Sequence, residues 1–143
     1  MNRSKVLIFL LMALLMTGSV ILSSCGATTE PINVTLIIEA GEDEILNVTM
    51  PIAMKDPTVL ALVSEAAVIY ELNVTYNDNN DSVKDIENYT YRTDENGVMY
   101  FWEYLINDVL PENTTGGKAN AQPITDGMKI TYKYSSYDPK SSK

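Results

Sequence analysis

The chain has 143 residues, with 10 Lys and Arg against 19 Asp and Glu, a formal net charge of −9, one cysteine and no histidine. The missing histidine excludes Ser-His-Asp and Cys-His catalysis and histidine-based zinc sites, and a single cysteine excludes an intrachain disulfide or a Cys-x-x-Cys pair. The acidic balance also argues against nucleic-acid binding, because that needs a basic patch. The function classes that remain are binding without chemistry, a metal site with oxygen ligands, and acid-base chemistry by carboxylates, lysine or tyrosine.

The N-terminal segment has the pattern of a lipoprotein signal peptide. Arg3 and Lys5 precede an unbroken apolar run, Val6–Met16. This run is shorter than the ~20 residues that a membrane-spanning helix needs. The segment ends in Leu22–Cys25 (LSSC), which resembles the bacterial lipobox. The resemblance implies cleavage before Cys25 and diacylation of its thiol. A secreted protein with a spare thiol and an uncleaved membrane anchor are the alternatives.

The predicted lipid explains the lone cysteine, because stable membrane attachment needs several acyl chains. We therefore expect a bacterial, extracytoplasmic protein held at the cell membrane by its lipid. Loss of the two leader cations changes the net charge from −9 to −11, and repulsion then holds the domain off an anionic membrane. The expected organisation is a signal peptide in 1–24, the lipidated cysteine and a short tether in 25–32, one domain in 33–134, and a flexible tail in 135–143.

The first part of the domain predicts a hairpin and one helix. Apolar and polar residues alternate in Asn33–Glu39 and again in Ile45–Met54, with a polar turn between them. Pro51 places the second strand at a sheet edge or ends it. Asp56 and Pro57 predict the helix start, with Asp56 as the N-cap. Apolar residues at helical spacing then share one face: Val59, Leu62, Val63, Ala66, Ile69 and Tyr70.

The second part of the domain predicts further strands. Short β-prone segments occur at Leu72–Tyr76 and around Tyr89–Tyr91, and an Asn-Gly turn precedes Val98–Asn107. Val98–Asn107 is the most apolar segment and is expected to be the central strand. A last strand begins at Met128 and ends at Tyr134. The order of hairpin, helix and strands predicts a single α+β domain, with one helix packed on a mixed sheet of four or five strands, as in the β-grasp or ubiquitin-like architecture.

Three segments carry a family resemblance. Trp102–Asn107 (WEYLIN) is followed by a loop of about fifteen residues and then by Ile124–Tyr132 (ITDGMKITY), and the helix opens with Pro57–Leu62 (PTVLAL). These segments resemble the transcobalamin-like C-terminal domain, a β-grasp module of bacterial surface proteins and the smaller domain of animal cobalamin carriers. The resemblance covers about residues 33–134. It implies binding of a corrinoid or cobalamin-like ligand for uptake.

Two positions depart from the family pattern. Asp108 stands where the family has glycine, so this turn is less free to adopt a positive φ. Met128 stands at the third position of the family's Asp-Gly-Asp motif. The helical barrel that completes the corrin site in the animal carriers has no counterpart here, and the chain has no histidine to ligate cobalt.

The aromatic strand supplies the candidate ligand residues. Trp102, with Tyr100 and Tyr104 on the same face, would stack on a flat ligand, although alternating aromatic residues are also typical of a core. On the opposite face, Phe101 would join an exposed apolar patch with its neighbours if that face is open. The patch would consist of Met99, Phe101 and Leu105. The candidate ligand-binding residues are Tyr100, Phe101, Trp102, Tyr104 and Asn107.

Other chemistry finds little support in the sequence. Asn77, Asn79 and Asp81 have the alternate spacing of calcium ligands, but Ser82 and Asn88 occupy positions where an EF-hand needs Gly and Glu. We therefore expect a solvated loop and no metal site. No carboxylate pair predicts an enzyme, and no cofactor is expected unless cobalamin is the ligand. The alternative to ligand binding is a surface interaction module that binds a protein or a glycan.

Overall fold

The computed structural model describes residues 30–111 and 118–141. The predicted signal peptide and Cys25 lie outside these residues. The described part contains one α-helix, α2 (Val59–Ile69). Among residues 30–111 and 118–141, no helix has the length and apolar character that crossing a membrane requires.

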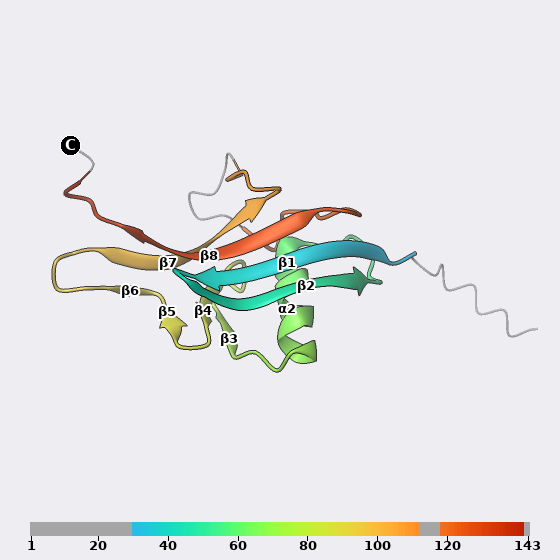
Figure 1. Cartoon of the computed structure of the whole chain (residues 1–143), viewed down its shortest axis with the longest axis horizontal. Helices are drawn as coiled ribbons and strands as arrows, with labels where there is room; N and C mark the ends of the chain where they lie inside the picture. Colours follow the sequence, from blue (N-terminus) through green and yellow to red (C-terminus); the bar gives the residue numbers. More distant parts are fainter. Residues whose placement is uncertain (1–29, 112–117, 142–143) are drawn as a thin grey trace, which may run out of the picture.

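Five strands form the main sheet, and three short strands form a second, smaller sheet (Figure 1). The main sheet has the order β2-β1-β8-β7-β6, in which β1 and β8 are parallel and the other neighbours are antiparallel. The expected α+β class, with one helix and a mixed sheet, is therefore confirmed. The main strands are β1 (Ile32–Ala40), β2 (Asp43–Ile52), β6 (Arg92–Thr93), β7 (Met99–Ile106) and β8 (Lys129–Tyr137). The small sheet contains β3 (Val74–Tyr76), β4 (Val83–Ile86) and β5 (Tyr89–Thr90).

The core lies between α2 and one face of the main sheet. Residues that face each other across neighbouring strands point to the same side, as Leu36 and Ile130 do, and Tyr132 and Tyr104. Alternation in β1 buries every second side chain, which confirms the predicted strand. The helix contributes its own buried stripe of Val59, Leu62, Val63 and Ala66.

The arrangement and length of the strands differ from the sequence prediction in three ways: in which strand is central, in where β8 ends, and in the separate small sheet. β8, and not the aromatic strand β7, is the central strand, because β8 pairs with β1 on one side and with β7 on the other. The outer neighbour of β7 is β6, which has two residues. β8 also continues to Tyr137, so the first residues of the predicted tail pair with β7. Finally, β3, β4 and β5 form a sheet of their own and do not extend the main sheet.

The prediction for β2 is confirmed, and the predicted helix start is wrong. β2 is an edge strand, which tolerates Pro51 near its end. The N-cap of α2 is Thr58, whose hydroxyl accepts a hydrogen bond from the amide of Ala61 at 3.2 Å. Asp56 lies two residues earlier with a φ of 51°, in the left-handed region.

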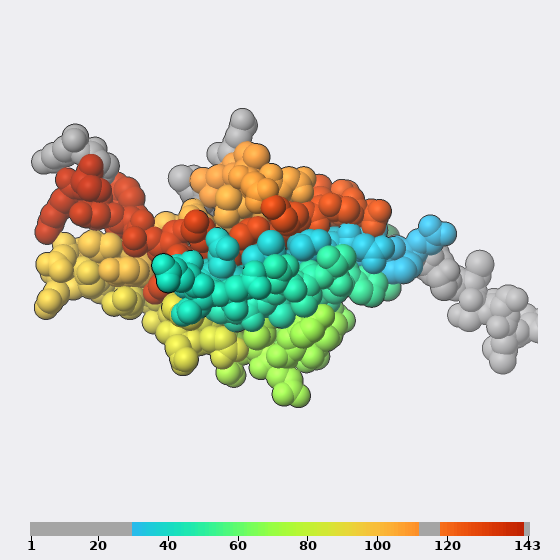
Figure 2. Space-filling model, viewed as in Figure 1, coloured from blue at the N-terminus to red at the C-terminus, as the bar shows by residue number. Residues whose placement is uncertain are grey.

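The predicted apolar face of α2 is correct for its first two turns only. Ile69 and Tyr70 were expected to be buried with the rest of the stripe, but both are exposed. The last turn of the helix lies at the margin of the molecule, where the green segment projects in Figure 2. The predicted stripe therefore ends at Ala66.

Candidate functional site

Two aromatic pairs lie side by side across β7 and β8, on the face that the core covers. The inner pair is Tyr104 and Tyr132, with ring centroids 5.7 Å apart. Tyr132 is 2% exposed, and its hydroxyl has no hydrogen-bond partner among the described residues. Burial raises the pKa of Tyr132 well above its usual value and also raises the pKa of Tyr104. This pair belongs to the core.

The outer pair is Trp102 and Tyr134, whose ring centroids are 5.2 Å apart. Both polar atoms of this pair bond to the backbone of β5. The Trp102 indole nitrogen donates to the carbonyl of Tyr89 at 2.9 Å, and the Tyr134 hydroxyl donates to the carbonyl of Thr90 at 2.7 Å. The Tyr89 ring meets the indole edge to face at 6.2 Å. These contacts attach the small sheet to the main sheet.

Tyr89 also links the small sheet to the start of β2. Its hydroxyl donates a hydrogen bond to the carboxylate of Asp43. This bond raises the pKa of Tyr89, and burial and the negative charge of Asp43 act in the same direction. The aromatic side chains at this end come from β5, β7 and β8, and hydrogen bonds to β5 and to the start of β2 hold them.

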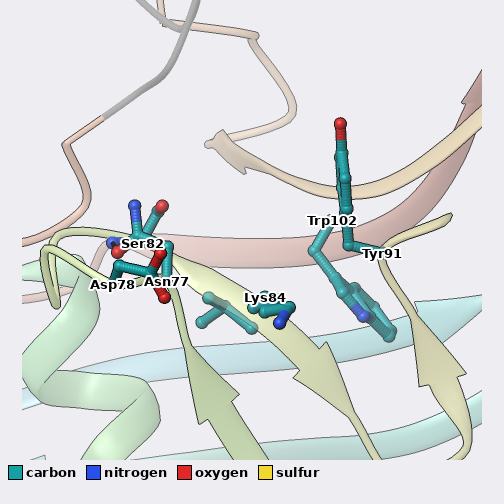
Figure 3. A pocket seen from close by; sticks show the side chains of 7 residues that line it. Asn77, Asp78, Ser82, Lys84, Tyr91 and Trp102 are labelled. Carbon is teal, nitrogen blue, oxygen red and sulfur yellow. Dashed lines mark hydrogen bonds between the residues drawn. The ribbon is translucent and has the colours of Figure 1, made fainter.

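A cleft of about 400 Å³ opens beside Trp102 (Figure 3). Figure 3 shows Tyr91 and Trp102 on one side, Asn77, Asp78 and Ser82 on the other, and Lys84 between them. These residues come from the β3–β4 turn, from β4, from the residue after β5 and from β7. The lining consists of Asn77, Asp78, Ser82, Val83, Lys84, Tyr91 and Trp102.

The β3–β4 turn forms one wall of this cleft and is closed by hydrogen bonds. The side-chain oxygen of Asn77 accepts hydrogen bonds from the amides of Asp81 and Ser82, at 3.0 and 3.3 Å. The side-chain nitrogen of Asn77 donates to the carboxylate of Asp81 at 2.6 Å. The same loop is bound to the segment before β8, because the Asn120 amide donates to the Asp81 carbonyl at 3.2 Å. The loop that begins at Asn77, predicted to be a solvated loop and not a calcium site, is thus closed by its own hydrogen bonds.

Three polar groups remain available to a ligand in the cleft. The carboxylate of Asp78, the ammonium of Lys84 and the hydroxyl of Tyr91 make no side-chain hydrogen bond or ion pair with the described residues. An apolar wall with a few polar groups of both charge signs is typical of a small-molecule site. Within residues 30–111 and 118–141, no group of three or more His, Cys, Asp or Glu side chains could hold a metal ion.

The five candidate residues predicted from the sequence do not form one cluster. Trp102 lines the cleft, whereas Tyr104 is in the core. Tyr100 stacks on Tyr134 at 6.2 Å, with the Arg92 guanidinium 4.1 Å from the centroid of its ring. Phe101 faces the opposite side of the sheet, because it pairs with Ser135 while Trp102 pairs with Tyr134.

Asn107 has a structural position in the turn that follows β7. Its side-chain oxygen accepts a hydrogen bond from the Lys129 amide at 2.9 Å. Asn107 and Asp108 have φ values of 50° and 66°, so Asp108 adopts the positive φ that glycine would favour. Asn and Asp tolerate this region better than other residues, and the two form a tight turn closed by Ile106 and Val109. Lys129 binds the Asp108 carboxylate at 2.5 Å.

The predicted apolar patch on the opposite face of β7 is not formed. Met99, Phe101 and Leu105 are all half-buried, and none is among the exposed apolar side chains of the described residues. Charged side chains also separate these apolar residues. Glu103 lies between Phe101 and Leu105 on β7, and Lys133 is its neighbour in the register of β8. This face carries polar side chains on the neighbouring strands as well.

Sequence reasoning missed most of the residues that line the cleft. The polar loop that begins at Asn77 was recognised, but nothing in the sequence places it opposite Trp102. Tyr91 was assigned to the strand predicted around Tyr89–Tyr91, although β5 ends at Thr90. The cleft arises from contacts between β4 and β7, which have no local sequence signal.

The sequence matches no known protein family and no curated protein. Among solved structures, the fold is similar to haptocorrin in complex with Cbi, with a TM-score of 0.61 and 10% identity over 77% of this chain. The match covers 26% of the haptocorrin chain, so this chain spans about a quarter of it. A candidate metal binding protein from Ruminococcus gnavus ATCC 29149 has a TM-score of 0.49 and 11% identity, over 75% of this chain and 99% of that one. The α+β domain therefore resembles a part of haptocorrin in fold.

Proposed function

We propose that this chain is a lipid-anchored, extracytoplasmic bacterial protein whose β-grasp domain binds a corrinoid or cobalamin-like ligand for uptake. The observation that carries the ligand is the similarity in fold to a part of haptocorrin, whose structure contains Cbi. The motifs that resemble the transcobalamin-like domain support the same ligand from the sequence alone. We infer binding and not catalysis, because the sequence has no histidine, a single cysteine and no carboxylate pair that predicts an enzyme.

The cleft beside Trp102 is the proposed contact site for this ligand. Its volume of about 400 Å³ is near the lower end of the 300–1,000 Å³ that is usual for small-molecule sites. It would therefore contact one part of a large flat ligand and leave the rest outside. Tyr91 supplies an exposed ring, and Lys84 and Asp78 supply polar contacts. Trp102 is 8% exposed, so it contributes an edge and not a stacking face.

Calorimetry and absorption spectroscopy with cobalamin test this site, using the chain from Gly26 onward. Tyr91→Ala should weaken binding about tenfold, which corresponds to 1.4 kcal/mol. Tyr70→Ala is the matched control, because Tyr70 is also an exposed tyrosine and does not line the cleft. The absence of heat and of a spectral change at high micromolar protein would contradict the proposed ligand.

The lipid anchor has a separate test. Cys25→Ala should leave an unprocessed precursor that incorporates no labelled fatty acid, because the thiol carries the predicted diacylglyceryl group. Ser24→Ala is the matched control, since it keeps a small residue before the cysteine. Normal processing of the Cys25→Ala chain would contradict lipidation without affecting the ligand proposal.

The second candidate function is a surface interaction module that binds a protein or glycan partner and no small ligand. A cluster of exposed apolar side chains at the end of α2 favours it. These side chains do not line the cleft, so the two functions can be tested independently.

A further inference from the structure

The last turn of α2 exposes three consecutive apolar side chains. Val68, Ile69 and Tyr70 are 78%, 52% and 39% exposed. At 100° per residue, three consecutive positions span about 200° of the helix circumference, so more than half of the end of the helix is apolar. We name these three residues the helix-end surface. Figure 2 shows the corresponding green segment projecting at the margin of the molecule, where a partner has access.

The turn that follows this surface has an unfavourable residue. The Leu72 amide donates to the Ala67 carbonyl at 3.0 Å, which is the bond of a Schellman motif. This motif usually has glycine in the left-handed position, but here Glu71 occupies it with a φ of 55°. A side chain in this conformation is strained. Strain of this kind persists only where the surrounding structure holds the residue in place.

The charge at the helix-end surface is also contrary to the stability rules. The C-terminus of a helix carries partial negative charge and favours Lys or Arg nearby, yet the last turn has no basic residue. Glu65 and Glu71 are instead exposed beside it. Neither carboxylate forms an ion pair with any residue that the structure describes. The surface therefore has an apolar centre and a negative rim.

The apolar centre and the negative rim together restrict which partner the helix-end surface can bind. A second copy of the chain would bring the same negative rim against itself, in a protein that already has a net charge of −9. An anionic membrane would repel it for the same reason. A segment with apolar residues flanked by Lys or Arg complements both the centre and the rim. We propose that the helix-end surface binds an amphipathic protein segment of this basic type.

A labelled amphipathic peptide of leucine and lysine tests the proposal, with the full chain held in nanodiscs of phosphatidylcholine and empty nanodiscs subtracted. Replacing both apolar residues in Val68→Ser/Ile69→Ser should weaken binding at least about tenfold, because the apolar contact is lost while the net charge is unchanged. Val109→Ser/Leu110→Ser is the matched control. It removes an exposed apolar pair elsewhere and should leave binding within about twofold of the original chain.

Further variants separate the apolar and the charged contributions. Glu65→Gln/Glu71→Gln should weaken binding and reduce its dependence on salt. Glu71→Gly should raise the urea midpoint, because it relieves the strained turn. The same variant should also bind the peptide more weakly, because one carboxylate of the negative rim is lost. An equal affinity for both apolar double variants would overturn the proposal, since attraction would then be general to an acidic protein. Preference for a leucine and glutamate peptide, or a dimer that Val68→Ser/Ile69→Ser abolishes, would also overturn it.

Discussion

The two aromatic pairs of β7 and β8 have the same local pattern and different environments. Tyr104 and Tyr132 are covered by the core, and within the part of the chain that the structure describes the hydroxyl of Tyr132 has no hydrogen-bond partner. Trp102 and Tyr134 are covered by β5, whose backbone accepts a hydrogen bond from each. The first pair therefore leaves a polar group buried at a cost, whereas the second satisfies both polar groups and borders the cleft.

This difference shows that the covering element decides the role of an aromatic strand. Both pairs are alternate residues of the same two strands and face the same side. A helix offers mostly apolar side chains to the sheet beneath it. A short edge strand such as β5 offers carbonyl groups, and its end leaves space beside the indole.

The outer pair should carry more of the stability than its position near a cleft suggests. Trp102→Ala should lower the free energy of unfolding by about 3–5 kcal/mol, measured by urea denaturation, because a large buried side chain and its bond to β5 are lost. Trp102→Phe keeps most of the ring and should cost about 1 kcal/mol for the missing hydrogen bond. A cost below 1 kcal/mol for Trp102→Ala would mean that β5 is not held by the indole.

The inner pair should make the protein sensitive to alkali. The pKa of Tyr132 is higher in the folded chain than in the unfolded chain, where it is about 10. Above pH 10 the unfolded chain therefore loses this proton first, and stability should fall by about 1.4 kcal/mol per pH unit. Stability from this residue is fully present below pH 10. Urea midpoints at pH 9 and pH 11 measure the loss, which should be smaller in Tyr132→Phe.

Removing one hydroxyl from each pair should have opposite effects. Tyr132→Phe should raise the free energy of unfolding by about 1 kcal/mol, because it removes a buried hydroxyl without a partner. Tyr134→Phe should lower it by about 1 kcal/mol, because the carbonyl of Thr90 loses its donor. Thermal or urea unfolding of the two variants provides the measurement. Changes of the same sign would show that the environments of the two hydroxyls are alike.

The cleft itself should contribute little to stability. Tyr91→Ala should change the free energy of unfolding by less than about 0.5 kcal/mol, because the side chain is exposed and makes no hydrogen bond through its hydroxyl with the described residues. Any loss of ligand affinity in this variant then reflects the site and not the fold. A larger loss of stability would place Tyr91 in the structural support of the cleft.

The elements were more predictable than their arrangement. Alternation identified β1, β2 and most of β8, and helical spacing identified α2, because these patterns are local. The cap of the helix was placed two residues too early, since Asp56 and Pro57 resemble a helix start as closely as Thr58 does. The ends of elements depend on contacts such as that of Thr58 with Pro123, which the sequence does not display.

The candidate site was predictable only in part. Trp102 was identified from its strand, but its neighbours Asn77, Lys84 and Tyr91 come from other segments that meet it only in the folded chain. The lipobox at Leu22–Cys25 stays a prediction, because it lies outside the described residues. Its basis is the order of residue types along the chain, so no tertiary contact is needed to propose it.

By itself, the sequence determined the α+β class, the faces of the long strands, and the exclusion of histidine and disulfide chemistry. These features depend on periodicity and composition, which every segment carries on its own. Only the tertiary structure decided that β8 is central, that the Tyr132 hydroxyl is buried without a hydrogen-bond partner among the described residues, that a cleft opens beside Trp102, and that the end of α2 is exposed. Each of these depends on which distant segment lies against a residue, and such contacts leave no pattern within a single segment: β8 lies between β1 and β7, and the cleft forms where β4 meets β7.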